Sequence, residues 1–121
     1  MSAITTHVLD TARGRPAAGV AVVLERQVRA TMGEQGAQGW ERVGRAATDD
    51  DGRARTLLPP DARFEAGIYR LTFATGPYFK AQGLAAFYPE ASVTFEVTDA
   101  AQHYHVPLLL SPFGYSTYRG S

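Results

Sequence analysis

The strongest constraint on the fold is an alternation of apolar and polar residues that recurs over short stretches of the chain. In residues 20–26 an alternate set of apolar side chains, Val20, Val22 and Leu24, shares one face, and residues 3–9, 69–73 and 93–97 show similar spacing. A period of two places such side chains on one face of an extended strand, whereas a helix needs a period of about 3.6. The chain is therefore predicted to be all-β.

Turn-forming residues separate these strand patterns. Stretches rich in glycine, proline, serine or aspartate lie at residues 13–19, 49–52, 58–67 and 111–114, and such residues favour turns. Seven or eight short strands of this kind are typical of an antiparallel β-sandwich. Because 121 residues can bury one ordinary core, we expect a single domain over residues 1–121.

Two segments depart from the strand pattern. Pro77 can occupy a first helical turn and Gly83 can end one, which predicts a short helix over residues 76–83. Residues 28–39 hold three glycines and no periodicity. They are predicted to form a flexible hairpin loop.

Composition excludes several functional classes. Twelve Lys and Arg balance twelve Asp and Glu, so no basic field indicates a nucleic acid or a membrane as partner. The absence of cysteine excludes a disulfide scaffold, a thiol nucleophile and a thiolate metal site. No apolar run approaches the roughly 18 to 20 residues that span a bilayer, and a strand pattern instead of a signal peptide follows Met1. We expect a cytoplasmic protein.

The three histidines are candidates for chemistry because imidazole titrates near neutral pH. His103 and His105 flank Tyr104, and residues two apart in a strand share a face. Both could therefore ligate zinc with His7 as a third ligand. Alternatively, they hydrogen-bond within a crowded sheet, and their spacing does not decide between the two.

The acidic stretch before Arg53 resembles a calcium loop only superficially. With Gly52 as the loop glycine, an EF-hand would need acidic residues at positions 47 and 58, which are Ala47 and Leu58. The stretch is therefore predicted to be a tight turn that places Arg53 at the start of a strand. A guanidinium suits planar, oxygen-rich groups.

The closing segment, residues 105–121, carries little charge before Arg119. It is predicted to form two strands around the turn at 111–114. Such a hairpin needs burial on both faces, and one sandwich core covers one face, so we expect a second subunit on the other. Pro107 has no N–H to donate, which predicts an edge position or a bulge there.

Together, four segments resemble the 5-hydroxyisourate hydrolases, the transthyretin-related enzymes of urate breakdown. The resemblance runs in order from Thr5 to Ser121 and implies a transthyretin-like sandwich. Its most specific part is the terminal tetrapeptide Tyr-Arg-Gly-Ser, the C-terminal signature of that family. The segments are "THVLDTARGRPAAGV", "TDDDGR", "HYHVPLLLS" and "GYSTYRGS".

The resemblance also implies which residues act. His7, Arg53 and His105 would be catalytic, and His7, Arg53 and Tyr118 would contact the substrate. His103 and Ser121 would have supporting roles, with Gly120 letting the chain turn so that the Ser121 carboxylate meets a cation or donor. No metal or other cofactor is implied.

The implied reaction is hydrolysis of 5-hydroxyisourate to 2-oxo-4-hydroxy-4-carboxy-5-ureidoimidazoline in urate degradation. The family forms homotetramers, which are dimers of dimers with sites in a channel between dimers. Three alternatives remain open at this point: a transthyretin-like carrier without catalysis, a zinc hydrolase with three histidine ligands, and a structural module. The sequence does not tell which histidine is the general base.

Overall fold

The computed structural model describes residues 3–29 and 38–120. In this part of the chain, nine strands and one short helix are found, and seven of the strands are longer than two residues. The elements are β1 (Ile4–Asp10), β2 (Arg15–Pro16), β3 (Ala21–Arg29), β4 (Gln38–Ala47), β5 (Arg53–Ala54), β6 (Gly67–Phe73), α1 (Thr75–Lys80), β7 (Ala91–Val97), β8 (Tyr104–Ser111) and β9 (Gly114–Thr117).

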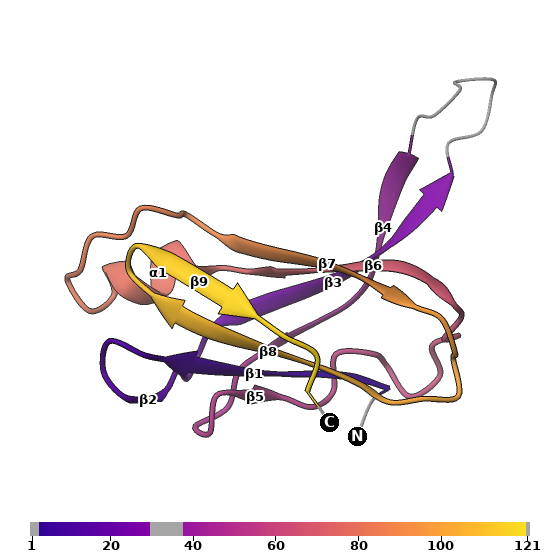
Figure 1. Cartoon of the computed structure of the whole chain (residues 1–121), viewed down its shortest axis with the longest axis horizontal. Coiled ribbons are helices and arrows are strands. Elements are labelled where there is room, and N and C mark those ends of the chain that lie inside the picture. The colour runs from indigo at the N-terminus through magenta and orange to yellow at the C-terminus, as the bar shows by residue number, and fades with distance from the viewer. Residues whose placement is uncertain (1–2, 30–37, 121) are drawn as a thin grey trace.

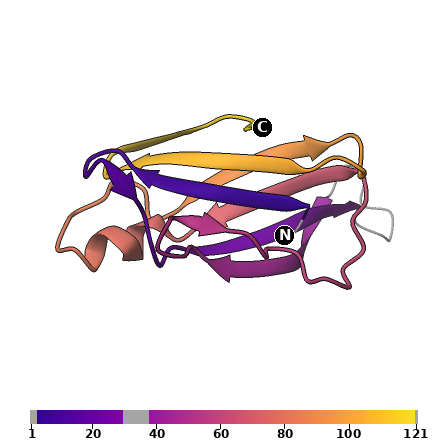
Figure 2. The same ribbon diagram turned by 90° about the horizontal axis from the view of Figure 1, so that it is seen from below.

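The strands form two sheets that pack face to face, as predicted (Figure 1). The first sheet has the order β2-β1-β8-β9, with β5 also paired to β1, and the second has the order β4-β3-β6-β7. Figure 2 shows β1 and β8 in one layer and β3 and β4 in the other. The all-β sandwich expected from the sequence is confirmed.

The alternation in the sequence becomes the core between the two sheets. In β8, the even-numbered residues from Tyr104 to Leu110 are buried, and in β6 the odd-numbered residues from Tyr69 to Phe73 are buried. Each such large apolar side chain contributes roughly 1.5–3 kcal/mol when it leaves water. The largest fully buried side chains are Tyr69, Phe73, Phe79, Ile4, Leu24, Leu57, Leu71, Leu108, Leu110, Val8, Val20 and Val22.

One strand pair differs from the antiparallel arrangement that was predicted. β1 and β8 run parallel, from Ile4 opposite Tyr104 to Asp10 opposite Leu110. The other strand pairs in the described residues are antiparallel. The parallel pair brings an early and a late segment of the chain side by side at the centre of the first sheet (Figure 1).

The short helix is confirmed, but it ends earlier than the predicted range of residues 76–83. α1 covers Thr75–Lys80. Beyond it, the N–H of Gln82 donates to the carbonyl of Phe79, and that of Gly83 to the carbonyl of Lys80. These bonds span three residues instead of four, so the segment tightens into a turn. In the described residues, no helix is both long and apolar enough to cross a membrane.

The predicted loop at residues 28–39 is shorter than expected. β3 continues to Arg29 and β4 begins at Gln38, with Val28 opposite Gly39. Residues 30–37 lie outside the described residues. The described end of β3 and the described start of β4 extend away from the two layers (Figure 1).

Pro107 marks a local edge position in its strand, as predicted, and no bulge forms there. β8 pairs with β1 through Pro107 without a register shift, but its pairing with β9 covers only residues 108–111. On the β9 side, Pro107 has no N–H with which to continue the ladder. Pairing with β9 stops at Thr117 and resumes as one bridge between His105 and Gly120. By this register Tyr118 lies opposite Pro107, which has no N–H to offer it.

Candidate active site

The residues predicted to be catalytic share the outer face of the first sheet, which is the face turned away from the core. Residues directly opposite each other in paired strands share a face. His7 of β1 lies opposite Arg53 of β5, and His105 of β8 lies opposite Thr5 of β1. The alternate residues Ile4 and Ala54 are buried in the core. The structure therefore brings His7, Arg53 and His105 together, as the sequence predicted.

A tight turn over residues 49–53 positions Arg53. One Asp49 carboxylate oxygen accepts the backbone N–H of Asp51 at 2.9 Å and that of Arg53 at 3.0 Å. Gly52 has a φ of 76°, and its carbonyl accepts the N–H of Val8 in β1 at 2.7 Å. These bonds attach the turn to β1 directly beside His7.

The pKa of the Asp49 carboxyl is held below its ordinary value, mainly because the Arg53 N–H donates to it. The N–H of Asp51 and the charges of Arg55 and Arg53 act in the same direction. Arg55 also forms an exposed ion pair with Asp49 at 2.9 Å. The carboxylate stays ionised and keeps the turn closed over the pH range of ordinary assays.

The same turn determines which ring nitrogen of His7 carries a proton when the ring is neutral. Its Nε2 lies 2.8 Å from the carbonyl oxygen of Asp51. A carbonyl only accepts hydrogen bonds, so Nε2 carries a proton and donates it. In the neutral form of His7, the unprotonated nitrogen is therefore Nδ1.

His105 and His103 share one hydroxyl. The Thr5 Oγ1 lies 2.8 Å from His105 Nδ1 and 3.0 Å from His103 Nε2. Thr5 is only 4% exposed although it belongs to the outer face, and His103 is exposed. Thr5 was not recognised as a site residue from the sequence. The available signal was its place two residues before His7 in an alternating strand.

The pKa of His105 is lowered from its ordinary value of 6.5, first by burial of the ring. The positive charge of Arg53 lowers it further, and His103 and His7 act in the same direction. A neutral His105 near neutral pH can accept a proton. Within the described part of the chain its Nε2 has no hydrogen-bond partner, so this nitrogen is available to a substrate or a water.

Gly120 lies directly against His105. This contact, and not the predicted turn of the chain, explains why the residue is a glycine. Its N–H donates to the His105 carbonyl at 2.8 Å. Its φ lies outside the left-handed region, so no turn requires a glycine there. A Cβ added to Gly120 would lie 2.7 Å from Cδ2 of the His105 ring. Glycine is required here by close packing.

Tyr118 lies between the end of β9 at Thr117 and the bridge of Gly120 with His105, and it is 56% exposed. With its neighbours Thr117 and Arg119 it borders a cavity of about 230 Å³ against β7. In the described residues its hydroxyl has no hydrogen-bond partner. Arg119 turns away, with its guanidinium 4.6 Å from the centre of the Tyr104 ring. Ser121 lies outside the described residues.

The histidines do not form a metal site. Among the described residues, no three His, Cys, Asp or Glu side chains are arranged to hold a metal ion. Thr5 occupies the two nitrogens of His103 and His105 that face each other. The three-histidine zinc site is therefore not formed.

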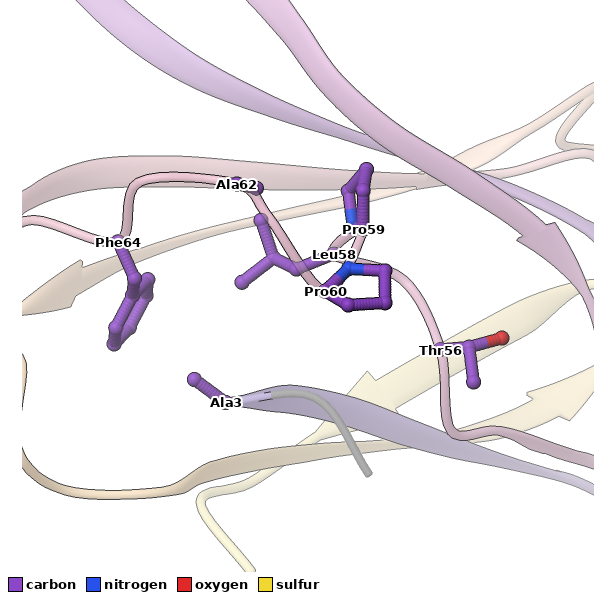
Figure 3. A pocket seen from close by; sticks show the side chains of 7 residues that line it. All are labelled: Ala3, Thr56, Leu58, Pro59, Pro60, Ala62 and Phe64. Carbon is purple, nitrogen blue, oxygen red and sulfur yellow. The ribbon is translucent and has the colours of Figure 1, made fainter.

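A cavity of about 330 Å³ lies elsewhere, between the start of β1 and the loop after β5 (Figure 3). Six of its seven lining residues are apolar, and no charged side chain lines it. It offers no acid, base or cation for catalysis. The lining residues are Ala3, Thr56, Leu58, Pro59, Pro60, Ala62 and Phe64.

Comparison with known proteins identifies the family. The family model described as "Transthyretin: HIUase/Transthyretin family" matches residues 4–120. This chain belongs to the HIUase/Transthyretin family. The match includes each of the four residues for which the sequence suggested a direct role, namely His7, Arg53, His105 and Tyr118.

Curated members of the HIUase/Transthyretin family resemble the chain over nearly its full length. The 5-hydroxyisourate hydrolase of Caulobacter vibrioides is 48% identical over 125 residues, which cover 100% of both chains. The uric acid degradation bifunctional protein TTL of Arabidopsis thaliana is 46% identical over 124 residues, covering 98% of this chain and 37% of that longer protein.

Solved structures of the family share the fold. The 5-hydroxyisourate hydrolase of Klebsiella pneumoniae matches with a TM-score of 0.78 and 36% identity, covering 98% of both chains. Sea bream transthyretin in complex with thyroxine matches with a TM-score of 0.83 and 31% identity, covering 98% of this chain and 95% of that one. The transthyretin-like fold is thus common to an enzyme and to a binding protein.

Proposed function

We propose that this protein hydrolyses 5-hydroxyisourate to 2-oxo-4-hydroxy-4-carboxy-5-ureidoimidazoline, a step in urate degradation. The observation that carries the proposal is the grouping of His7, Arg53 and His105 on one sheet face. The relatives that are named 5-hydroxyisourate hydrolases and a uric acid degradation protein support the same activity.

The fold alone does not distinguish this enzyme from a transthyretin-like carrier. The TM-score to a transthyretin bound to thyroxine is as high as that to a hydrolase, and function depends on the residues placed on a fold. Identity is higher to the Caulobacter hydrolase, at 48%, than to sea bream transthyretin, at 31%. Two imidazoles and a guanidinium gathered on one face also suit hydrolysis better than simple binding.

Opening a cyclic amide needs a base for the attacking water, a donor for the developing oxyanion and an acid for the leaving nitrogen. We assign the base to His105, because its pKa is lowered and its Nε2 is available. Arg53 would bind the planar substrate through its oxygens and stabilise the oxyanion. His105 would return the proton taken from water to the leaving nitrogen through Nε2. His7, whose Nε2 donates to the Asp51 carbonyl, would accept a hydrogen bond from the substrate at its unprotonated Nδ1.

Tyr118 is proposed as a substrate contact. The residue is exposed, and its hydroxyl has no partner among the described residues. It lies two residues before Gly120, which pairs with His105, so the chain brings it close to the proposed base. A phenol in this position can hydrogen-bond to one edge of a planar substrate without taking part in proton transfer.

The homotetramer implied by the family resemblance, a dimer of dimers, is part of the proposal. In the single chain the outer face of the first sheet is open on the side where substrate would bind. Leu9 and Leu109 lie on this face and are only partly buried. A second copy facing it would cover these leucines and enclose the site from water.

The test is an absorbance assay with freshly generated 5-hydroxyisourate. The protein should accelerate the decay of the substrate's ultraviolet absorbance, whereas a carrier would not. His105→Asn should reduce turnover by about 10²- to 10⁴-fold and leave the circular dichroism spectrum unchanged. Glu90→Gln, which alters a charge outside the proposed site, should behave like the unchanged protein. A wild-type protein that fails to accelerate decay would refute the activity.

A further inference from the structure

We propose that Thr5 is a positioning residue that couples His105 to His103 and lets the base pass its proton to an exposed imidazole. This inference rests on the proposed hydrolase function. It concerns a residue outside the catalytic set that the sequence suggested. It assigns a purpose to a hydroxyl that contacts two histidines.

The geometry makes Thr5 a bridge. Its Oγ1 is 2.8 Å from His105 Nδ1 and 3.0 Å from His103 Nε2, and both distances are within hydrogen-bond range. A hydroxyl has one proton to donate and lone pairs to accept. Thr5 therefore donates to one imidazole while accepting from the other.

Two arrangements of the bridge follow from this rule. In the first, His105 Nδ1–H donates to Thr5, and Thr5 donates to His103 Nε2. His105 Nε2 is then unprotonated and can act as a base. In the second, His103 Nε2–H donates to Thr5, Thr5 donates to His105 Nδ1, and His105 Nε2 carries the proton.

The first arrangement converts to the second during turnover. When His105 Nε2 takes a proton from water, His105 becomes an imidazolium. Its Nδ1 proton moves to the Thr5 oxygen as the original Thr5 proton moves to His103 Nε2. One positive charge is thereby transferred from His105 to His103, and His105 is left neutral with a proton on Nε2.

The charges around the bridge favour this direction. His105 is partly buried and faces the positive charge of Arg53 and the ring of His7, and these lower its pKa. His103 is exposed, so a charge there is hydrated and its Nδ1 proton can leave to solvent. His105 Nε2–H is then ready to donate to the leaving nitrogen or to release its proton.

The backbone holds the bridge in place. Thr5 lies opposite His105 in the parallel β1–β8 pair, with paired residues on either side. Thr5 is 4% exposed, and a β-branched side chain has few χ1 rotamers. The hydroxyl is consequently fixed between the two rings, and water does not replace it easily.

The first test compares Thr5→Val, which removes the hydroxyl and keeps the shape, with Thr5→Ser, which keeps the hydroxyl. Losing one hydrogen bond that acts in the transition state reduces kcat by roughly tenfold. Thr5→Val should show this loss with KM nearly unchanged and with an altered acid limb of the pH profile. Thr5→Ser should remain within about threefold of wild type, since the hydrogen-bonding group is retained.

The second test does not need activity. In ¹⁵N spectra of histidine side chains, Thr5→Val should shift His105 Nδ1 and His103 Nε2 together, while His7, held by the Asp51 carbonyl, provides the internal control. Inactive wild-type protein would refute the proposed function but leave this bridge testable. The inference is overturned if Thr5→Val leaves both nitrogens unshifted, or if Thr5→Ser loses as much kcat as Thr5→Val.

Discussion

At the scale of single residues, the two histidines of the site differ because of the atoms that they contact. His7 faces a carbonyl oxygen, which only accepts, so its tautomer is fixed. His105 faces a hydroxyl, which donates or accepts, so its Nδ1 can hold or release a proton. The different roles proposed for the two histidines follow from these partners more than from the imidazoles themselves.

The lowered pKa of His105 predicts the pH dependence of activity. A base must be neutral, and burial together with Arg53, His103 and His7 lowers the pKa of His105 below 6.5. The acid limb of kcat/KM should therefore fall below pH 6.5. The folded state binds this proton less readily than the unfolded state, so stability should also decline as the pH falls through this range.

The contribution of Arg53 to this pKa can be isolated. Arg53→Gln removes a nearby positive charge and should raise the pKa of His105, measured by NMR titration of the ring. Arg55→Gln is the matched control, because Arg55 pairs with Asp49 and is not among the causes of the shift. A His105 pKa that is the same in both variants would contradict the assigned cause.

Gly120 should be sensitive to the addition of a single methyl group. In Gly120→Ala the new Cβ would lie 2.7 Å from the His105 ring, so the ring must move. A displacement of about 1 Å at a catalytic group can cost on the order of 10²-fold in rate, and we expect kcat to fall by roughly 10- to 100-fold.

Gly114→Ala in the same hairpin is the control for Gly120→Ala. Its Cβ would meet only the Ser111 Oγ at 3.8 Å, an ordinary contact. Steady-state kinetics and thermal unfolding of both variants provide the comparison. Equal kcat in the two variants would show that the approach of Gly120 to His105 does not matter.

The sequence suggested the charged and ionisable residues of the proposed site but missed the close contacts around them. His7, Arg53 and His105 were found because their positions resemble a known family and their chemistry is distinctive. Thr5 was missed because its role depends on two rings about 100 residues away in the chain. The need for Gly120 likewise depends on a ring that periodicity cannot place beside it.

At the scale of elements, the turn over residues 49–53 has two functions. It aims Arg53 through the two backbone N–H groups held by Asp49, and it sets the tautomer of His7 through the Asp51 carbonyl. Both effects depend on Gly52, whose carbonyl binds β1 at Val8. A distortion of this turn should therefore affect stability and catalysis together.

Gly52→Ala is predicted to reveal this dependence. Alanine at a φ of 76° costs roughly 1–2 kcal/mol, and its Cβ would in addition lie too close to the Val8 carbonyl. We expect a loss of about 3 kcal/mol or more in the free energy of unfolding by urea, with reduced kcat.

Gly14→Ala separates the two effects. Gly14 has a φ of 68°, and an added Cβ would have nothing within 4 Å. Gly14→Ala should therefore lower the free energy of unfolding only by the cost of placing alanine at a positive φ, about 1–2 kcal/mol. Its activity should be unchanged. If both variants lose the same stability, the close approach of Gly52 to β1 has no energetic effect.

Most strands could be located from the sequence, but their pairing could not. Periods of two located β1, β3, β6 and β7 because one face of each packs in the core, whereas β8 was predicted from an apolar run before a turn. Periodicity does not say which strand lies beside which, so the parallel β1–β8 pair was not foreseen. The interruption at Pro107 could be predicted from the residue alone, because proline has no N–H to donate to a neighbouring strand.

At the scale of the whole molecule, a cluster of exposed aromatic side chains lies at one end of the sandwich. Phe87, Tyr88 and Tyr115 make edge-to-face ring contacts, and Phe113 is 72% exposed at the β8–β9 turn. The Phe87 N–H donates to the Pro112 carbonyl, which joins the two loops. Exposed apolar groups of this kind mark association surfaces.

Phe113→Ser should weaken the proposed homotetramer. Removing the ring lowers the apolar area available for association, so light scattering at low protein concentration should show a smaller species than for wild type. Phe113→Leu, which keeps an apolar side chain, should retain the assembly. If Phe113→Ser and wild type have the same mass at every concentration, this loop does not contribute to the assembly.

The parallel pairing of β1 with β8 has a consequence for how the protein becomes active. Thr5 and His105 are 100 residues apart in the chain, so the catalytic groups meet only through a contact of very high sequence separation, which closes late and slowly. A nascent chain would hold His7 and Arg53 long before it has His105. Recovery of turnover during refolding would therefore report closure of the first sheet and not the earlier collapse of the core.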